Sequence, residues 1–327
     1  MSSNCKKKVF VTRRIPQPGL DMLQERYEVV INPHNRVLNK DELIDGIRAA
    51  DGLLCLLTDE ITAEIMDVNP NLKVISNYAV GYNNIDVAAA TQRGIMVTNT
   101  PGVLTDATAD LTWALLMAVS RRVVEGDALT RAGRFMGWDP MLLLGSDISG
   151  KTLGIIGMGR IGQAVARRAV GFDMKILYYD KAPVPEAEKY KAEFVSLDEL
   201  LQEADFVTLH APLTDETRHI ISRRELQLMK RTAYLINTAR GPLVDEKALV
   251  EALQEGIIAG AGLDVYEYEP RLTDGLAGLP NTVLLPHLGS ATLETRTKMA
   301  TMAAGNLIAA LEGKRPPNLV NPEVLQD

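Results

Sequence analysis

Three polar residues in the second half of the chain have types that suit proton transfer and the binding of a small acid. Arg240, Glu269 and His287 are 29 and 18 residues apart and lie at strand-like apolar runs or in loops after them. Histidine has the ordinary pKa nearest neutrality, so His287 is a candidate general acid or base. Glu269 would pair with the charged imidazole. Arg240 offers a planar fork of N–H donors to a carboxylate and polarises a carbonyl on which negative charge develops.

Each of the three also has a plainer interpretation when it is taken alone. His287 could be a hydrogen-bonded loop histidine, Arg240 part of a surface ion pair, and Glu269 a solvated carboxylate before the proline of a turn. Together they favour an active site, because a proton donor, a carboxylate that pairs with it and an arginine that binds an acid group suit one reaction on a small acid.

A glycine-rich turn precedes these residues and has the setting of a phosphate-binding loop. It follows an apolar strand at 153–156 and opens a helix at 163–169, which is the context that the dinucleotide fingerprint G-x-G-x-x-G requires. Gly157 would permit the tight turn, Gly159 would let the backbone approach a pyrophosphate, and Gly162 would let helix and strand pack closely. The expected cofactor contacts in this turn are Gly157, Met158, Gly159, Arg160, Ile161 and Gly162.

The strand after this helix ends at an acid that bears on the choice of cofactor. Asp180 lies 18 residues beyond Gly162, where a carboxylate would accept hydrogen bonds from both ribose hydroxyls and repel a 2′-phosphate. The sequence therefore predicts NAD (NADH). NADP stays open as the less favoured cofactor, because Lys181 could hold a phosphate if the Asp180 side chain turned aside. Alternatively, Asp180 only caps the next turn.

Around these residues, short apolar runs alternate with segments of helical period, which is typical of a parallel sheet covered by helices. The first third predicts strands at 9–12, 28–31, 52–57, 74–78 and 96–99, and helices at 19–26, 40–49 and 87–93. A helix at 107–120 and a Gly-rich segment of low periodicity at 126–150 follow. The second series predicts strands at 153–157, 175–179, 206–210, 233–237, 259–264 and 283–286, and a last helix at 291–312. We expect one α/β domain (1–100 and 290–327) interrupted by another (101–289).

The chain resembles the D-2-hydroxyacid dehydrogenase family. The resemblance rests on three motifs in order, Asn237–Gly241 (NTARG), Gly262–Pro270 (GLDVYEYEP) and Leu285–Ser290 (LPHLGS), with the glycine fingerprint ahead of them. It runs over nearly the whole chain. It implies an α/β fold of two doubly wound parallel-sheet domains, in which a Rossmann NAD-binding domain is inserted in a flavodoxin-like substrate domain.

The resemblance also implies roles for individual residues around the cofactor. Asp264 would receive the nicotinamide amide and orient the ring. Thr108 is similar to the family's cofactor-side threonine, although an ordinary hydroxyl at a helix N-terminus is the plainer interpretation. His210 would lie beside the cofactor through its backbone. Further cofactor contacts are expected at Pro212, Thr238, Ala239, Arg240, His287 and Gly289.

The segment 77–86, which follows a strand of the first domain, is the expected substrate side. Its glycine lets backbone N–H groups point at an anion, so the amides of Val80 and Gly81 are assigned to the substrate carboxylate, together with the side chains of Arg240 and His287. In phosphoglycerate dehydrogenases an arginine typically occupies the position of Asn77, and its absence argues for an uncharged substrate tail.

The segment looks most like that of glyoxylate and hydroxypyruvate reductases. The expected reaction is the NAD(P)H-dependent reduction of glyoxylate or hydroxypyruvate to the D-2-hydroxy acid. Phosphoglycerate, D-lactate and phosphite dehydrogenases remain alternatives, as does a non-catalytic, NADH-sensing binding protein like the corepressors of this fold. The stretch at about 105–145 looks like the family's dimerisation arm, which implies a homodimer. Within it, Trp138 resembles the tryptophan that one subunit lends to the other's site.

Composition and charge point away from several other classes of protein. The net charge of −7 gives no broad cationic surface for nucleic acid or anionic lipid. The longest apolar stretch, 111–119, is roughly half of a membrane span. Neither Cys5 nor Cys55 has a Cys or His at metal-ligand spacing, so we expect reduced thiols and no metal site. The expected location is the cytoplasm.

Overall fold

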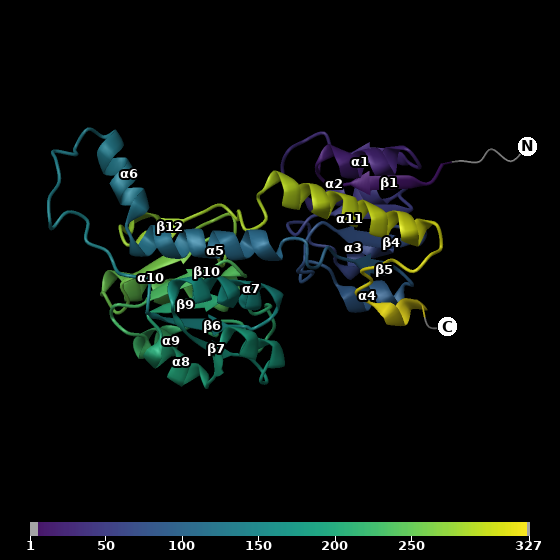
Figure 1. Cartoon of the computed structure of the whole chain (residues 1–327). Helices are drawn as coiled ribbons and strands as arrows, with labels where there is room; N and C mark the ends of the chain where they lie inside the picture. The colour runs from purple at the N-terminus through teal and green to yellow at the C-terminus, as the bar shows by residue number, and fades with distance from the viewer. Residues whose placement is uncertain (1–5, 326–327) are drawn as a thin grey trace, which may run out of the picture. The chain divides into compact units, whose positions relative to one another are not determined.

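The computed structural model describes residues 6–325, so Cys5 lies outside the described part. The chain forms two compact units. Unit 1 takes the described residues up to Leu104 and those from Ala291 onwards, and unit 2 takes Thr105–Ser290. Figure 1 shows the chain leaving unit 1 after β5 and returning to it with α11.

Unit 1 is built on one sheet of five parallel strands in the order β2-β1-β3-β4-β5. Its strands are β1 (Lys8–Val11), β2 (Glu28–Ile31), β3 (Gly52–Cys55), β4 (Val74–Asn77) and β5 (Met96–Thr98), and its helices are α1 (Gln17–Gln24), α2 (Lys40–Ile47), α3 (Ala63–Asp67), α4 (Val87–Gln92) and α11 (Leu293–Leu311). Successive side chains of a strand face opposite sides of the sheet. Val9 and Val11 accordingly pack with α1 and α11, whereas Phe10 packs with α2 and α3. The strand order is that of a flavodoxin-like domain.

Unit 2 holds a second parallel sheet of seven strands in the order β12-β11-β10-β9-β6-β7-β8. The strands are β6 (Thr152–Ile156), β7 (Lys175–Tyr179), β8 (Glu193–Phe194), β9 (Phe206–Leu209), β10 (Tyr234–Asn237), β11 (Gly260–Leu263) and β12 (Thr282–Leu284). The helices are α5 (Thr105–Ser120), α6 (Val123–Arg131), α7 (Arg160–Ala169), α8 (Leu197–Glu203), α9 (Arg223–Leu228) and α10 (Glu246–Gln254). Counted within the unit, the order 3-2-1-4-5-6 is that of a Rossmann sheet, with β12 as an added edge strand. The expected α/β fold of two doubly wound parallel sheets is confirmed.

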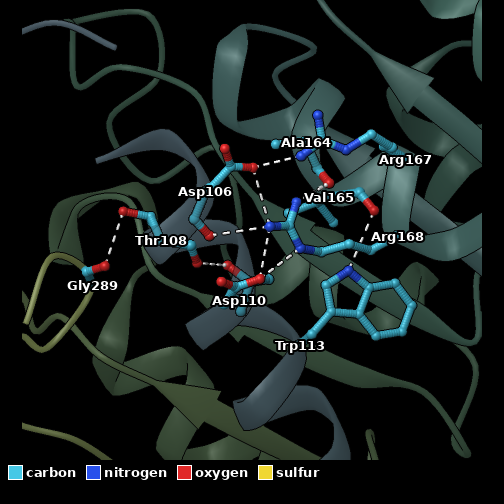
Figure 2. A network of polar contacts seen from close by, with 10 residues as sticks. Asp106, Thr108, Asp110, Trp113, Ala164, Val165, Arg167, Arg168 and Gly289 are labelled. Atoms are coloured by element: carbon cyan, nitrogen blue, oxygen red, sulfur yellow. Dashed lines mark hydrogen bonds and ion pairs between the residues drawn. The ribbon is translucent and has the colours of Figure 1, made fainter. Parts of the chain in front are cut away.

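Helix α5 is fastened to α7, the helix that follows the glycine-rich turn, by ion pairs and one aromatic side chain (Figure 2). Arg168 lies 2.7 Å from Asp110 and 3.1 Å from Asp106, and Arg167 lies 2.5 Å from the same Asp106 oxygen. The indole of Trp113 donates to the Val165 carbonyl at 3.3 Å. These contacts fix α7 against the face of the sheet that α5 covers.

Several elements differ from the expectations above, and three of them show why. The short helix α3 and the two-residue strand β8 were absent from the predicted pattern. Helix α6 lies within and before the stretch expected to lack periodicity, and none of its residues is buried. Its support is local instead, with the pairs Arg122–Glu125 and Arg131–Asp127. A helix that buries no face gives no apolar period to detect.

Over the described residues, no helix combines the length and the apolar character that crossing a membrane needs.

Candidate active site

At two of the three glycines of the glycine-rich turn between β6 and α7, a side chain would collide with neighbouring backbone atoms. Gly157 has a positive φ of 96°, and a Cβ there would lie 2.5 Å from the Ala211 nitrogen. A Cβ on Gly162 would lie 2.1 Å from the Gly157 carbonyl oxygen. A Cβ on Gly159 would meet nothing within 4 Å. The turn therefore packs closely against β9 and α7 and leaves open space over Gly159, as a bound pyrophosphate requires.

The start of α7 supplies donors to that open space. Gly159 is the N-cap and has no side chain that could cap the helix. The helical ladder begins with the bond from the Gln163 N–H to the Gly159 carbonyl at 2.9 Å, so the N–H groups of Arg160 and Ile161 precede it. Gly159 and Arg160 are exposed. These residues fit a dinucleotide pyrophosphate at a helix N-terminus.

Asp180 stands one residue beyond β7 and is tied to the glycine-rich turn. One carboxylate oxygen accepts from the Met158 N–H at 2.8 Å and the other from the Lys181 N–H at 2.7 Å. The Lys181 ammonium lies 2.6 Å from Glu216, and this hydrogen bond raises the pKa of Lys181. The acid is thus held at the turn, while the lysine is engaged by another carboxylate.

His287 and Glu269 are in contact, Nδ1 to Oε2, at 3.0 Å. The other Glu269 oxygen accepts from the Tyr266 N–H at 3.0 Å. Burial alone would raise the pKa of the Glu269 carboxyl, but the hydrogen bond and charge of His287 outweigh it and leave that pKa below its usual value. The His287 side chain is 28% exposed, so its edge is accessible to a small molecule.

Arg240 follows β10 and is half-buried. Loss of solvent around its guanidinium lowers its pKa, against the opposing effect of the Glu269 charge. Its Nη1 donates to the Ala239 carbonyl at 2.7 Å. Asn237 spans this turn, since its side chain donates to the Arg240 carbonyl at 2.9 Å and accepts from the Ala239 N–H at 3.0 Å. Sequence reasoning missed this function of Asn237, although an asparagine at a strand end is a typical signal of such a turn.

The Asp264 carboxylate holds the loop that carries His287. It accepts from the N–H groups of Leu288 at 2.6 Å and Gly289 at 2.8 Å, and burial raises its pKa. His287 has a positive φ of 57° and donates its own N–H to the Asp264 carbonyl at 2.9 Å. The Thr108 hydroxyl donates to the Gly289 carbonyl at 3.2 Å (Figure 2). Hydrogen bonds with Asp264 and Thr108 therefore fix the loop around His287, the residue with the left-handed backbone conformation.

The remaining residues expected near the cofactor lie in loops that follow β9 and β10. Both ring nitrogens of His210 are buried without a hydrogen-bond partner in the described chain, and burial lowers the pKa of this histidine to about 3, so its imidazole is neutral. The Pro212 carbonyl accepts from Thr217 at 2.7 Å. Thr238 shares a hydrogen bond with Thr112 at 2.8 Å, so its hydroxyl already has one protein partner.

In unit 1, Val80 and Gly81 lie in the loop after β4. Both are half-buried. Within the described residues, no group accepts a hydrogen bond from either of their N–H groups. The loop thus offers two unpaired backbone donors, which is what an anion needs.

The described residues hold no group of three or more His, Cys, Asp or Glu placed to bind a metal ion. Cys55 is a buried, free thiol, and burial raises its pKa well above the ordinary value.

Comparison with known proteins places these features in a family. Residues 113–289 match the model of the D-isomer specific 2-hydroxyacid dehydrogenase NAD binding domain. The glyoxylate reductase of Thermococcus gammatolerans is 54% identical over 98% of each chain. A solved protein of Thermus thermophilus superimposes with a TM-score of 0.90 at 52% identity, over 96% of this chain and 99% of that one.

A second solved relative was determined with ligands. It is the NADPH-dependent glyoxylate/hydroxypyruvate reductase of Sinorhizobium meliloti, in complex with NADP and malonate, with a TM-score of 0.86 and 34% identity over 98% of each chain. The chain belongs to the D-isomer specific 2-hydroxyacid dehydrogenases. It is an oxidoreductase, and unit 2 contains its NAD binding domain.

Proposed function

We propose that this protein reduces glyoxylate or hydroxypyruvate with NADH, giving the 2-hydroxy acid, in the D configuration where its carbon is chiral. The observation that carries the proposal is the contact of His287 with Glu269 at 3.0 Å, on a loop that Asp264 holds through two hydrogen bonds. The names of its relatives support the substrate class, since the Thermococcus gammatolerans protein is a glyoxylate reductase.

In the proposed reaction, each polar residue has one task. NADH, when bound at the glycine-rich turn, supplies the hydride that goes to the carbonyl carbon. His287 donates a proton to the carbonyl oxygen, and in the reverse direction the neutral imidazole removes the hydroxyl proton. Glu269 orients the imidazole and stabilises its charged form. Arg240 binds the substrate carboxylate and stabilises the negative charge that develops on the oxygen.

The cofactor contacts follow the same proposal. The donors of Gly159, Arg160 and Ile161 would hold the pyrophosphate, and Asp180 would hold the ribose. Asp264, Thr108 and Gly289 would border the nicotinamide, as would the backbone at His210, Pro212, Thr238 and Ala239. NADH is favoured over NADPH because Asp180 is fixed at the turn while Lys181 is engaged by Glu216.

On the substrate side, we assign the amides of Val80 and Gly81 to the carboxylate. Asn77 supports a substrate without a charged tail, because its two N–H donors are both used. They bind the Gly81 carbonyl at 2.9 Å and the Asn84 side chain at 3.1 Å. A phosphate on the substrate would find no free donor from this side chain.

We also propose that the protein is a homodimer, because residues 123–144 of unit 2 expose apolar side chains. Several large apolar side chains of residues 123–144 are exposed, among them Met136 at 93% and Trp138 at 85%. A monomer would leave this apolar surface in water. A second copy of the chain would cover it.

The test of the function is a matched set of initial rates. NADH and NADPH oxidation would be followed with glyoxylate, hydroxypyruvate, pyruvate and phosphohydroxypyruvate at equal concentrations. We expect fast turnover of glyoxylate or hydroxypyruvate with NADH. Turnover confined to pyruvate or phosphohydroxypyruvate would replace the substrate assignment. NADH binding without turnover of any acid would favour a nucleotide-sensing binding protein.

A further inference from the structure

The carboxyl ends of β4 and β5 in unit 1 carry asparagines whose side-chain amides donate to carbonyls of the loop after β4. Asn99, which follows β5, donates to the Val80 carbonyl at 2.7 Å. Asn77, the last residue of β4, donates to the Gly81 carbonyl at 2.9 Å. The backbone N–H of Thr100 donates to the Ala79 carbonyl at 2.8 Å. Three successive carbonyls of the loop are therefore held from the strand ends.

Holding a carbonyl also fixes the N–H of the following residue. The peptide group is planar and trans, so its C=O and N–H point in opposite directions. The bond from Thr100 to Ala79 sets the direction of the Val80 N–H, and the bond from Asn99 to Val80 sets that of the Gly81 N–H. These are the two N–H groups that find no acceptor among the described residues. The hydrogen bonds to the carbonyls of Ala79 and Val80 thus hold the N–H groups of Val80 and Gly81 in directions where they have no protein acceptor.

A second set of hydrogen bonds fixes the side chain of Asn77 through Asn84. Asn84 accepts from Asn77 at 3.1 Å and donates to the Leu56 carbonyl at 3.1 Å and the Asp59 carbonyl at 3.0 Å. Asp59 is buried, and its carboxylate accepts from the Leu56 N–H at 2.8 Å and from Thr12 at 2.5 Å. The network ties the loop after β4 to the loop after β3.

We propose that Asn99 is a positioning residue for the substrate carboxylate, with Asn77 and Asn84 as its supports. Asn99 acts by holding the Val80–Gly81 peptide plane, so that the Gly81 N–H stays directed at the anion. The inference rests on the proposed function, because it takes Val80 and Gly81 as the carboxylate site. It adds that the contribution of unit 1 to binding the acid comes from preorganised backbone donors.

The test compares Asn99→Ala with a matched asparagine elsewhere in unit 1. The substitution keeps the backbone bonds of residue 99, whose carbonyl accepts from Asn306 at 3.0 Å. Asn69 is the control, because it is buried and donates to the Ile47 carbonyl at 2.8 Å and the Ala50 carbonyl at 2.7 Å. Asn69 precedes β4 and Val80 follows it, so the two residues lie at opposite ends of this strand.

Two readouts separate positioning from simple destabilisation. For Asn99→Ala we expect the KM for glyoxylate to rise about tenfold, with kcat within about twofold because the catalytic residues are intact. Asn69→Ala should lower the melting temperature and leave KM unchanged. An unchanged KM in Asn99→Ala, or an equal rise in Asn69→Ala, would overturn the inference.

Hydrogen exchange keeps the inference testable if the wild-type protein reduces none of the acids. In the free protein, a peptide covering 78–84 should exchange faster in Asn99→Ala than in wild type, whereas Asn69→Ala should leave it unchanged. Oxalate, used as a stable dicarboxylate probe, should slow exchange of this peptide in the NADH-loaded wild type and less so in Asn99→Ala. Equal exchange in all three proteins would contradict the role of Asn99 independently of turnover.

Discussion

His287 Nδ1 lies 3.0 Å from Glu269 Oε2, and the second oxygen of the same carboxylate accepts from the Tyr266 N–H. The Tyr266 N–H therefore fixes the Glu269 carboxylate independently of its contact with the imidazole. A contact of this kind selects one orientation of the ring and leaves the other nitrogen, Nε2, to face a substrate.

Glu269→Gln tests the charge in this pair while keeping its shape. The amide can still hydrogen-bond His287 but no longer offsets a positive imidazole. We expect turnover of glyoxylate to fall by roughly one to two orders of magnitude. A Glu267→Gln control should keep wild-type turnover, because Glu267 contacts His219 instead. Turnover that is the same in all three proteins would rule out the electrostatic role of Glu269.

Gly159→Ala separates folding from cofactor binding. A methyl group there meets nothing within 4 Å of the protein, so the free energy of unfolding should change by less than about 1 kcal/mol. NADH affinity should nevertheless fall by at least about tenfold, because the methyl occupies the space proposed for the pyrophosphate. Gly171→Ala is the control, since its Cβ also meets nothing within 4 Å. Full NADH affinity in Gly159→Ala, measured by fluorescence titration, would place the dinucleotide elsewhere.

The preference for NADH should depend on Asp180 and on the partner of Lys181. Asp180→Gly removes the carboxylate at the turn, and Glu216→Gln frees the Lys181 ammonium, which now lies 2.6 Å from Glu216. We expect each change to raise kcat/KM for NADPH relative to NADH several-fold, and the pair to exceed either one. Glu188→Gln, at another exposed acid of unit 2, serves as the control. An unaltered ratio in the double variant would show that neither Asp180 nor Lys181 determines the choice between NADH and NADPH.

The ion pairs between α5 and α7 should stabilise the fold in a pH-dependent way. The pKa of Asp106 is lowered, mainly by the hydrogen bond from Arg168 and against the opposing effect of burial. A carboxyl with a lowered folded-state pKa stabilises the fold above its unfolded pKa, about 3.9, and this contribution is lost as the pH falls through the folded-state value.

Asp106→Asn should therefore lower the free energy of unfolding by about 0.5–1 kcal/mol at pH 7, a figure discounted for the solvent exposure of the pair. The difference from wild type should vanish below about pH 3. Asp127→Asn, which breaks a pair within α6 only, should cost less. Chemical denaturation at several pH values measures both variants. A deficit of Asp106→Asn that persists in acid would show that the loss is not electrostatic.

The sequence predicted apolar runs that are bracketed by turns better than elements that bury no side chain or span only two residues. The strands at 28–31 and 175–179 were expected with the bounds that the structure has, because turn residues and helical segments bracket their apolar runs. Helix α6 was not expected, since it buries no side chain, and β8 is only two residues long.

In the site, the sequence predicted the residues that lie in local motifs, but it could not predict hydrogen bonds between residues far apart in the chain. The glycine-rich turn, Asp180 and the contact of His287 with Glu269 were all expected from residue types and spacing. The sequence could not show that Asn99 bonds the carbonyl of Val80 or that Asp264 holds Gly289, because these pairs depend on how separate strands end side by side. The roles of all these residues in catalysis stay predictions.

The most direct test of the account is the turnover of His287→Ala. With glyoxylate and saturating NADH, we predict a fall in kcat of about 10²–10⁴-fold, while NADH affinity stays within about twofold because the glycine-rich turn is untouched. His34→Ala, at an exposed histidine of unit 1, should behave as wild type. Wild-type kcat in His287→Ala would contradict the proposal that this histidine transfers the proton.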